Sequence, residues 1–198
     1  VDFRFTDFAG LWQHFSVPAR ELNEASFAEG VGFDGSSIRG WQSINESDML
    51  VRPVAESAFI DPFLEATTLV LICDISDPLT GEDYTRDPRN VARKAEAYIA
   101  SSGLADTAYF GPEAEFFIFD DVRYQQGQQS AFYFIDSEEA HWNAGKDEAP
   151  NLGYKIAGKE GYAPVPPSDA TADLRAEIVA TMNSVGIDTF IDHHEVAT

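Results

Sequence analysis

Two glutamates stand two residues apart in the otherwise apolar stretch Phe110–Phe119. In an extended strand, Glu113 and Glu115 project from the same face, roughly 7 Å apart. Carboxylates at that separation repel each other unless a cation lies between them, and Mg²⁺ or Mn²⁺ prefers such oxygen ligands. A strand with one solvent-exposed face explains the same pattern without a metal, so both interpretations stay open.

A second cluster of ionisable residues runs from Asp192 to Glu195. Strand alternation puts His193 and Glu195 on one face and Asp192 and His194 on the other. Imidazole and carboxylate groups at this spacing can share a metal, directly or through a neighbouring ligand. A histidine-rich strand end in solvent is the alternative. Two carboxylate clusters on neighbouring strands favour a metal more than either cluster does alone.

A third candidate is the segment Gly32–Trp41, which is dense in Gly and Ser and contains Asp34, Ser36 and Ser37. It lacks the lysine of a phosphate-binding P-loop. By composition it is either an ordinary surface loop or a loop that presents a carboxylate and hydroxyl groups to a ligand.

The elements that would position these residues begin with a β-hairpin. Asp2–Thr6 and Leu11–Val17 both alternate apolar and polar residues, and Ala9-Gly10 lies between them. The pattern further predicts a short helix over 21–29, a loop over 30–40 and a strand over 67–74. We therefore predict a small α+β module in roughly the first 85 residues, bounded by the polar, turn-rich segment 74–85.

Capping residues predict a helix at the start of the following part. Asp87 supplies an N-cap, a proline follows at the first helical position, and Gly103 marks the C-terminal end. A second helix is predicted to be capped by Ser168 or Asp169 and to stop at Gly186. The remaining predictions are strands over 108–119, 132–135 and 187–196, a polar loop through residue 127, and coil over 143–167.

The composition excludes several classes of function. Thirteen Lys and Arg against 34 Asp and Glu give a formal net charge of −21, which repels nucleic acids and anionic membrane surfaces. The single cysteine, Cys73, lies in an apolar run and is predicted to be a buried, inert thiol. The sequence has no apolar run long enough to span a membrane and no signal peptide, so we expect a cytoplasmic protein. It also starts without Met, and we expect an upstream segment to be missing.

Six motifs together resemble successive signatures of type I glutamine synthetases, in the order found in that family. They are FDGSSIRGWQSINESDM (33–49), IDPF (60–63), RDPRNVARKAE (86–96), FGPEAEFFIFD (110–120), GYAPVPP (161–167) and HHEVAT (193–198). Several long motifs in register over nearly the whole chain are far more specific than any one of them.

The resemblance implies an α+β fold, in which a β-grasp-like N-terminal domain (residues 1–85) precedes the beginning of an antiparallel-sheet catalytic domain (residues 86–198). It implies a metal-dependent enzyme that joins ammonia to glutamate through a γ-glutamyl phosphate, with ATP as co-substrate and Mg²⁺ or Mn²⁺ as cofactor. It also implies a homo-oligomer, a dodecamer with active sites shared between subunits.

Site roles follow from the resemblance position by position. Glu115 and Glu195 match ligands of one metal, and Glu113 matches a ligand of the metal nearer the ATP phosphates. These three assignments agree with the clusters identified from spacing.

The remaining matched positions concern the reacting groups. Asp34, with Ser37 beside it, matches the aspartate that a neighbouring subunit contributes to bind and deprotonate ammonium. His193 matches a histidine close to the phosphates and glutamate.

The sequence also departs from the family pattern. It stops at Thr198, before a further glutamate ligand and most of the nucleotide site, so we expect this chain alone to be inactive. Phe190, Glu160 and Ala163 replace a usual Glu, Gly and Phe, which weakens the expectation of ATP binding. The alternatives are a related ligase that uses another amine and a non-catalytic assembly module.

Overall fold

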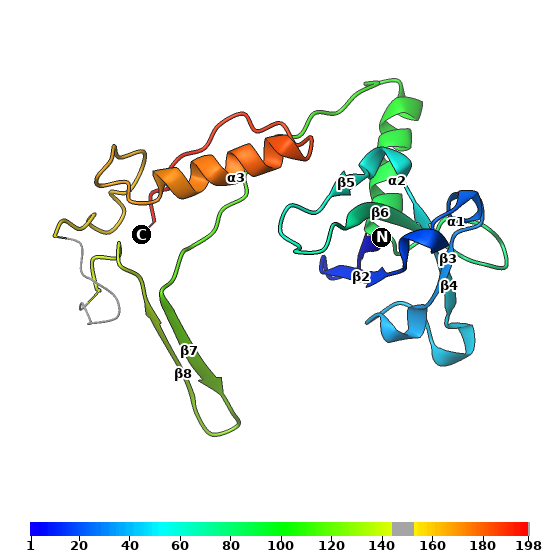
Figure 1. Ribbon diagram of the computed structural model, residues 1–198, viewed down its shortest axis with the longest axis horizontal. Coiled ribbons are helices and arrows are strands. Elements are labelled where there is room, and N and C mark those ends of the chain that lie inside the picture. The colour runs from blue at the N-terminus through cyan, green and yellow to red at the C-terminus, as the bar shows by residue number, and fades with distance from the viewer. Residues whose placement is uncertain (144–152, 198) are drawn as a thin grey trace. The chain divides into compact units, whose positions relative to one another are not determined.

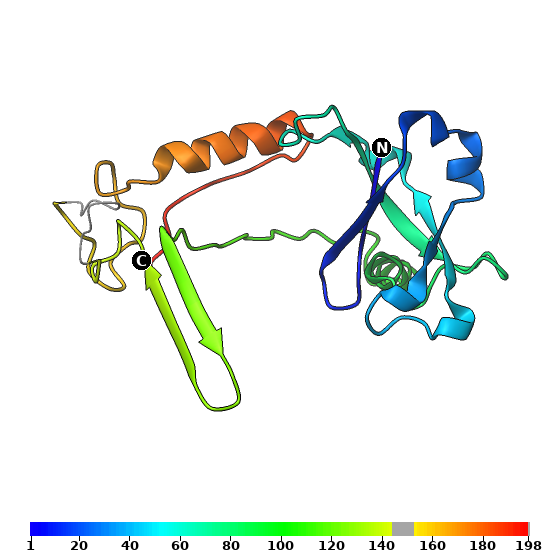
Figure 2. The ribbon, with the colours of Figure 1, turned by 60° about the horizontal axis from the view of Figure 1, so that its bottom comes forward.

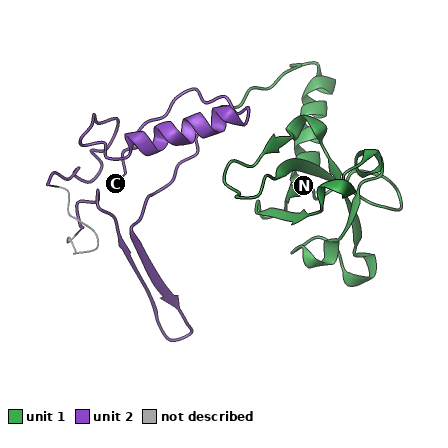
Figure 3. Ribbon diagram, viewed as in Figure 1, with its two compact units in different colours: residues 1–110 green, residues 111–198 purple. Residues whose placement is uncertain are grey.

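A computed structural model of the chain describes residues 1–143 and 153–197. The chain divides into two compact units, Val1–Phe110 and Gly111–Thr198 (Figure 3). Each unit is described by itself below. Among the described residues, no helix is both long and apolar enough to cross a membrane.

Unit 1 is built on one mixed sheet (Figure 1). Its strands are β1 (Asp2–Thr6), β2 (Trp12–Ser16), β3 (Val31–Asp34), β4 (Asp48–Pro53), β5 (Phe59–Ile60) and β6 (Leu69–Ser76). The order is β2-β1-β6-β4-β3, and β5 also pairs with β6. Strands β1 and β6 run parallel, whereas the other pairs are antiparallel. The predicted N-terminal hairpin and the strand near residues 67–74 are confirmed.

The core of unit 1 follows from the alternation of its strands. Phe3 and Phe5 of β1 are buried, and Phe5 packs on Trp41 with 5.6 Å between ring centroids. The same cluster also contains Met49, Val51, Leu71, Cys73 and Ile75. The prediction that Cys73 is buried is confirmed, and this burial raises the pKa of its thiol to about 12, which favours an inert cysteine.

Two α-helices complete unit 1. Helix α1 (Glu24–Ala28) is capped by Asn23, and helix α2 (Pro88–Ser102) is capped by Asp87 and ends at Gly103, which has a φ of 71°. Both helices and the predicted caps of the second are confirmed. Unit 1 also contains short 3₁₀ helices at 19–21, 44–46 and 55–57.

Helix α2 lies alongside the sheet (Figures 1 and 2) because Arg89 and Arg93 both bind the carboxylate of Asp74 on β6, at 2.7 and 2.5 Å. Unit 1 therefore extends past the sequence boundary at residue 85. A compact unit is defined by contacts within the structure, whereas the predicted boundary at residue 85 separates two family domains. The division at residue 85 therefore stays a prediction.

The predicted loop over residues 30–40 is wrong in its first part. Val31–Asp34 forms β3 against β4, with Val31 opposite Val51 and Phe33 opposite Met49. The high Gly and Ser content hides this short alternation, which the neighbouring strand and the aromatic core stabilise. A 3₁₀ turn, Gly35–Ser37, follows directly.

Unit 2 contains the hairpin β7 (Asp121–Gln126) and β8 (Ala131–Asp136) and the helix α3 (Ala172–Ser184) (Figure 1). The strand near Phe132 is confirmed, whereas the polar stretch before Gly127 was wrongly predicted as a loop. Helix α3 is confirmed, but its N-cap is Thr171 and not Ser168 or Asp169. Residues 153–167 of the predicted coil contain no helix or strand, and residues 144–152 of it lie outside the described residues.

The strands predicted over 108–119 and 187–196 are wrong as secondary structure. Both segments are coil, because neither pairs with a strand in a sheet among the described residues. The amides of Gly161 and Ala163 donate to Val196 O and His194 O, but these two hydrogen bonds form no strand. The apolar side chains of the two segments remain exposed, as the 88% exposure of Phe110 and 99% exposure of Phe190 show.

Candidate metal site

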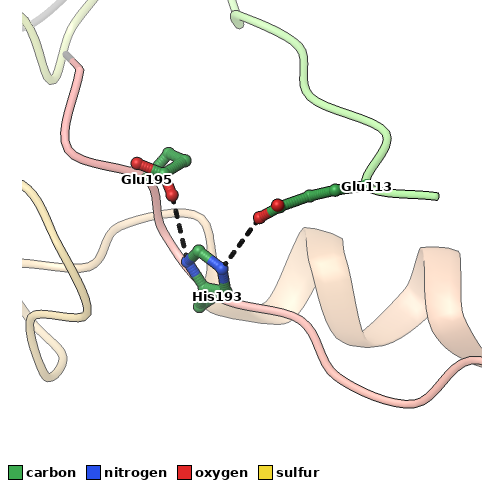
Figure 4. A group of neighbouring side chains, drawn as sticks. All are labelled: Glu113, His193 and Glu195. Carbon is green, nitrogen blue, oxygen red and sulfur yellow. Dashed lines mark ion pairs between the residues drawn. The ribbon is translucent and has the colours of Figure 1, made fainter. Parts of the chain in front are cut away.

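Three predicted site residues meet within unit 2. Glu113 Oε1 lies 3.3 Å from His193 Nε2, and Glu195 Oε1 lies 4.0 Å from His193 Nδ1. Figure 4 shows the two carboxylates facing different nitrogens of the same imidazole ring. One ligand atom from each residue lies within 4.8 Å of the others, close enough for the three to bind one ion. We refer to Glu113, His193 and Glu195 as the acidic triad.

The electrostatics of the acidic triad favour a cation. The pKa of His193 is raised because Nδ1–H donates to the carbonyl oxygen of His194 at 3.1 Å and because the carboxylates of Glu195 and Glu113 lie nearby. The same negative potential attracts a metal ion. Carboxylate oxygens with one imidazole nitrogen suit Mn²⁺ well, and Mg²⁺ through the oxygens, so the donor set fits the predicted metals.

Glu115 does not belong to the acidic triad, although alternation relates it to Glu113. Its role as a metal ligand stays a prediction. For His193, the spacing predicted a metal site shared with Glu195, and the resemblance implied a position close to the phosphates and glutamate. Its ring lies between two carboxylates, and both roles stay predictions. Glu115 is not part of the triad because residues 108–119 are not held in a regular pleat, so alternation along them does not determine which side chains reach His193.

The segment 192–196 is tied to the rest of unit 2 through Asp192. Arg175 of α3 donates to Asp192 Oδ1 at 3.1 Å and binds both carboxylate oxygens of Asp169, at 3.0 and 2.5 Å. These hydrogen bonds lower the pKa of Asp169 and raise that of Arg175. Asp192 is thus held to α3 through Arg175, and its predicted place on the opposite face from His193 and Glu195 stays a prediction.

Sequence reasoning missed Arg175, Glu139 and the structural role of Gly161. Arg175 lies on a predicted helix and has several acidic residues nearby in the sequence. The sequence does not indicate which of their carboxylates it binds. The motif around Gly161 was recognised only as a family signature. Its contact with His194 joins residues 33 positions apart.

Asp34 forms a separate polar cluster in unit 1. Its two carboxylate oxygens accept hydrogen bonds from the hydroxyl groups of Ser36 and Ser37, both at 2.6 Å, and from the Ser36 amide at 2.9 Å. The hydroxyl and amide donors lower the pKa of Asp34, so an anionic carboxylate is exposed at this loop. The sequence prediction that Asp34 and Ser37 lie together is consistent with this geometry, while their functional role is untested.

Hydrogen bonds at both ends hold the loop that carries Asp34. The Gly35 amide donates to Ser47 O at 2.6 Å, and a Cβ at Gly35 would lie only 2.3 Å from Met49 Sδ. Farther along, the Arg86 guanidinium donates to the carbonyl oxygens of Gly40 and Trp41, at 2.7 and 2.8 Å. The loop is therefore fixed at both ends by the β4 side of the sheet and by the residue before the N-cap of α2.

Comparison with known proteins identifies matches over both parts of the chain. Residues 1–78 match the model of the β-grasp domain of glutamine synthetase, and residues 85–198 match the model of its catalytic domain. A glutamine synthetase of Aquifex aeolicus is 57% identical over 198 residues, which are all of this chain and 42% of that protein. The chain thus spans less than half the length of the curated relatives it matches.

Two further similarities are informative. A 3-hydroxylaminophenol mutase of Cupriavidus pinatubonensis is 51% identical over 198 residues, covering all of this chain and 42% of that protein. The structure of the Plasmodium falciparum glutamine synthetase, determined by electron cryomicroscopy, matches with a TM-score of 0.84 at 22% identity, over all of this chain and 39% of that one. The latter match supports the predicted α+β fold with its N-terminal β-grasp domain.

Proposed function

Because this chain belongs to the glutamine synthetase family, we propose that it contributes a metal-binding part of an enzyme that joins ammonia to glutamate with ATP. The acidic triad is the observation that carries the proposal, since it gathers three ionisable residues from two family motifs far apart in sequence. The chain corresponds to 42% of the length of its relatives, so we expect no turnover from these residues alone.

The triad would hold one divalent cation through Glu113, His193 and Glu195, whereas the resemblance divides Glu113 from Glu115 and Glu195 between two metals. Glu115 would be a further ligand. Mg²⁺ or Mn²⁺ bound there would neutralise phosphate charge during transfer of the ATP γ-phosphoryl group to the side-chain carboxylate of glutamate. Ammonia would then displace phosphate from the resulting γ-glutamyl phosphate. His193, between two carboxylates, would orient both and remain near the phosphates.

Asp34 would bind ammonium and help to remove its proton. An exposed carboxylate that three donors keep anionic suits both tasks. Ser37, hydrogen-bonded to Asp34 Oδ2, would fix its orientation. In the proposed oligomer, a dodecamer in the cytoplasm, this loop would serve the site of a neighbouring subunit.

A second activity in the same family is favoured by one observation. The mutase of Cupriavidus pinatubonensis is 51% identical to this chain, close to the 57% of the Aquifex aeolicus enzyme, so identity of this order does not by itself determine the reaction. Phe190 also bears on which reaction the family member catalyses, because it replaces a usual glutamate of the nucleotide site and is 99% exposed. A metal site is compatible with either activity, whereas ammonium binding by Asp34 is specific to the ligase.

Metal binding is tested by calorimetric titration of the chain with Mn²⁺. We expect saturable binding that Glu113→Gln and Glu195→Gln each weaken by at least roughly 10-fold, because each removes a charged oxygen ligand. Glu177→Gln on the exposed surface of α3 is the matched control, with the same change of charge and no expected effect. A folded chain without saturable binding, or equal weakening by the control, would refute the metal site.

The reaction itself is tested with the protein expressed from the whole open reading frame that contains this sequence. The enzyme should form glutamine from glutamate, ammonia and ATP, and Asp34→Asn should reduce the rate most at low ammonium concentration. Isomerisation of 3-hydroxylaminophenol without glutamine formation would instead support the second activity.

A further inference from the structure

His194 is a buried ionisable residue of unit 2, and the proposed function assigns no role to it. The side chain of His194 is 5% exposed, whereas the side chains of its neighbours His193 and Glu195 are 21% and 35% exposed. A buried polar ring requires hydrogen-bonding partners, and their identity explains what the ring does.

The Nδ1 atom of His194 lies 2.8 Å from the carbonyl oxygen of Gly161 and 2.7 Å from that of Glu195. Because carbonyl oxygens only accept, Nδ1 must carry the proton. On the other side of the ring, Nε2 faces Glu139 Oε2 at 3.4 Å. The ring therefore joins the segment 192–196 to residue 161 through a fixed donor.

The backbone of His194 makes a second link to the same region. The Ala163 amide donates to the carbonyl oxygen of His194 at 3.0 Å. Gly161 and Ala163 are thus both hydrogen-bonded to His194. Tyr162, the residue between them, packs against the adjacent His193. Their rings make an edge-to-face contact with 5.2 Å between centroids.

This link matters because the segment that carries two members of the acidic triad belongs to no sheet. Apart from the amide bonds of Gly161 and Ala163 to Val196 and His194, no backbone ladder among the described residues fixes it. Side chains must then supply the orientation that a strand would otherwise give. Arg175 does so through Asp192, and His194 does so next to the triad itself.

We propose that His194 is a positioning residue, whose Nδ1–H bond to Gly161 O fixes the orientation in which His193 and Glu195 are presented to a divalent cation. The inference rests on the metal site proposed above. It assigns His194 a role without direct contact to the ion. Residues that orient metal ligands in this way typically change affinity by about 10-fold to 100-fold when they are removed.

The test compares His194→Leu with His194→Asn in the complete chain. Leucine fills a similar volume without a donor, whereas the asparagine Nδ2–H occupies nearly the position of the histidine Nδ1–H. We expect His194→Leu to weaken Mn²⁺ binding by about 10-fold or more, and His194→Asn to stay within about 3-fold of wild type. Glu139→Gln, which leaves the bond to Gly161 intact, should also stay within that range.

A second measurement needs no metal. Nuclear Overhauser cross-peaks between the ring protons of Tyr162 and His193 should be present in wild type and His194→Asn, and lost in His194→Leu. Circular dichroism verifies that each variant retains its helices, and His194→Ala replaces His194→Leu if the latter does not fold.

The outcomes separate the two proposals. Cross-peaks and Mn²⁺ affinity that are unchanged in His194→Leu, or lost equally in Asn and Leu, would overturn the positioning role. If wild type binds no Mn²⁺ but the cross-peaks depend on the donor as described, the metal site fails while the positioning of His193 by His194 stands.

Discussion

Asp87 offers a sharp test of how unit 1 is held together, because one buried carboxylate serves two elements. Oδ1 accepts from the amide of Arg89 in the first turn of α2, at 3.0 Å, and Oδ2 accepts from the amide of Ile75 on β6, at 3.2 Å. The residue is only 1% exposed. Burial raises the pKa of Asp87, so part of what the two hydrogen bonds contribute is offset by desolvation of the charge.

The substitution Asp87→Ala removes both acceptors. Loss of an N-cap costs about 1 kcal/mol, and a buried amide left without an acceptor costs about 1–3 kcal/mol. Relief of the buried charge offsets some of this, so we expect the free energy of unfolding of unit 1 to fall by about 2 kcal/mol. Asp87→Asn keeps one acceptor oxygen and should lose less.

The assay is urea denaturation followed by circular dichroism and tryptophan fluorescence. Asp106→Ala, an exposed change in the same unit, is the control and should stay within about 0.5 kcal/mol of wild type. The reasoning would be refuted if Asp87→Ala were as stable as this control.

The pH dependence tests the buried charge separately. A folded-state pKa raised above the unfolded value of 3.8 means that protonation of Asp87 stabilises the fold; this contribution is complete below that value and is lost as pH rises through the folded pKa. Asp87→Asn lacks this loss. Its stability deficit relative to wild type should therefore narrow as pH rises above about 4, and a widening deficit would contradict the assignment.

Three other predictions concern Gly35 in the loop that carries Asp34, the ion pair of Asp169 with Arg175, and the thiol of Cys73. Gly35→Ala should destabilise unit 1 by about 1–3 kcal/mol in urea denaturation, since the new Cβ would lie 2.3 Å from Met49 Sδ. Asp169→Asn should cost about 2 kcal/mol at pH 7, because it breaks charged hydrogen bonds to Arg175. As the folded pKa of Asp169 is lowered, its contribution is present above pH 3.8 and lost as pH falls through the folded value, so the difference from wild type should vanish in acid. Cys73, with its pKa raised to about 12, should resist alkylation at pH 8 until urea unfolds unit 1.

Local patterns in the sequence were sufficient for several parts of the molecule. The alternation of Phe3 and Phe5 predicted the first hairpin, and Asp87 with Gly103 predicted both ends of α2. These features depend on residues close together in the chain, and the family motifs gave the α+β fold and the candidate ligands.

Other features required the tertiary structure. Val31–Asp34 became a strand because β4 and the aromatic core of unit 1 lie beside it, although its composition indicates a loop. Residues 108–119 and 187–196 have strand-like patterns but join no sheet among the described residues, so they remain coil. Periodicity reports which face a side chain occupies and carries no information about which strand lies opposite.

The acidic triad shows the same division. The sequence by itself determined that Glu113, His193 and Glu195 are candidates. Only the tertiary structure put the imidazole between the two carboxylates and omitted Glu115 from the group. Contacts across 80 residues depend on how the intervening chain folds, whereas the orientation of a side chain relative to its neighbour depends only on the local backbone.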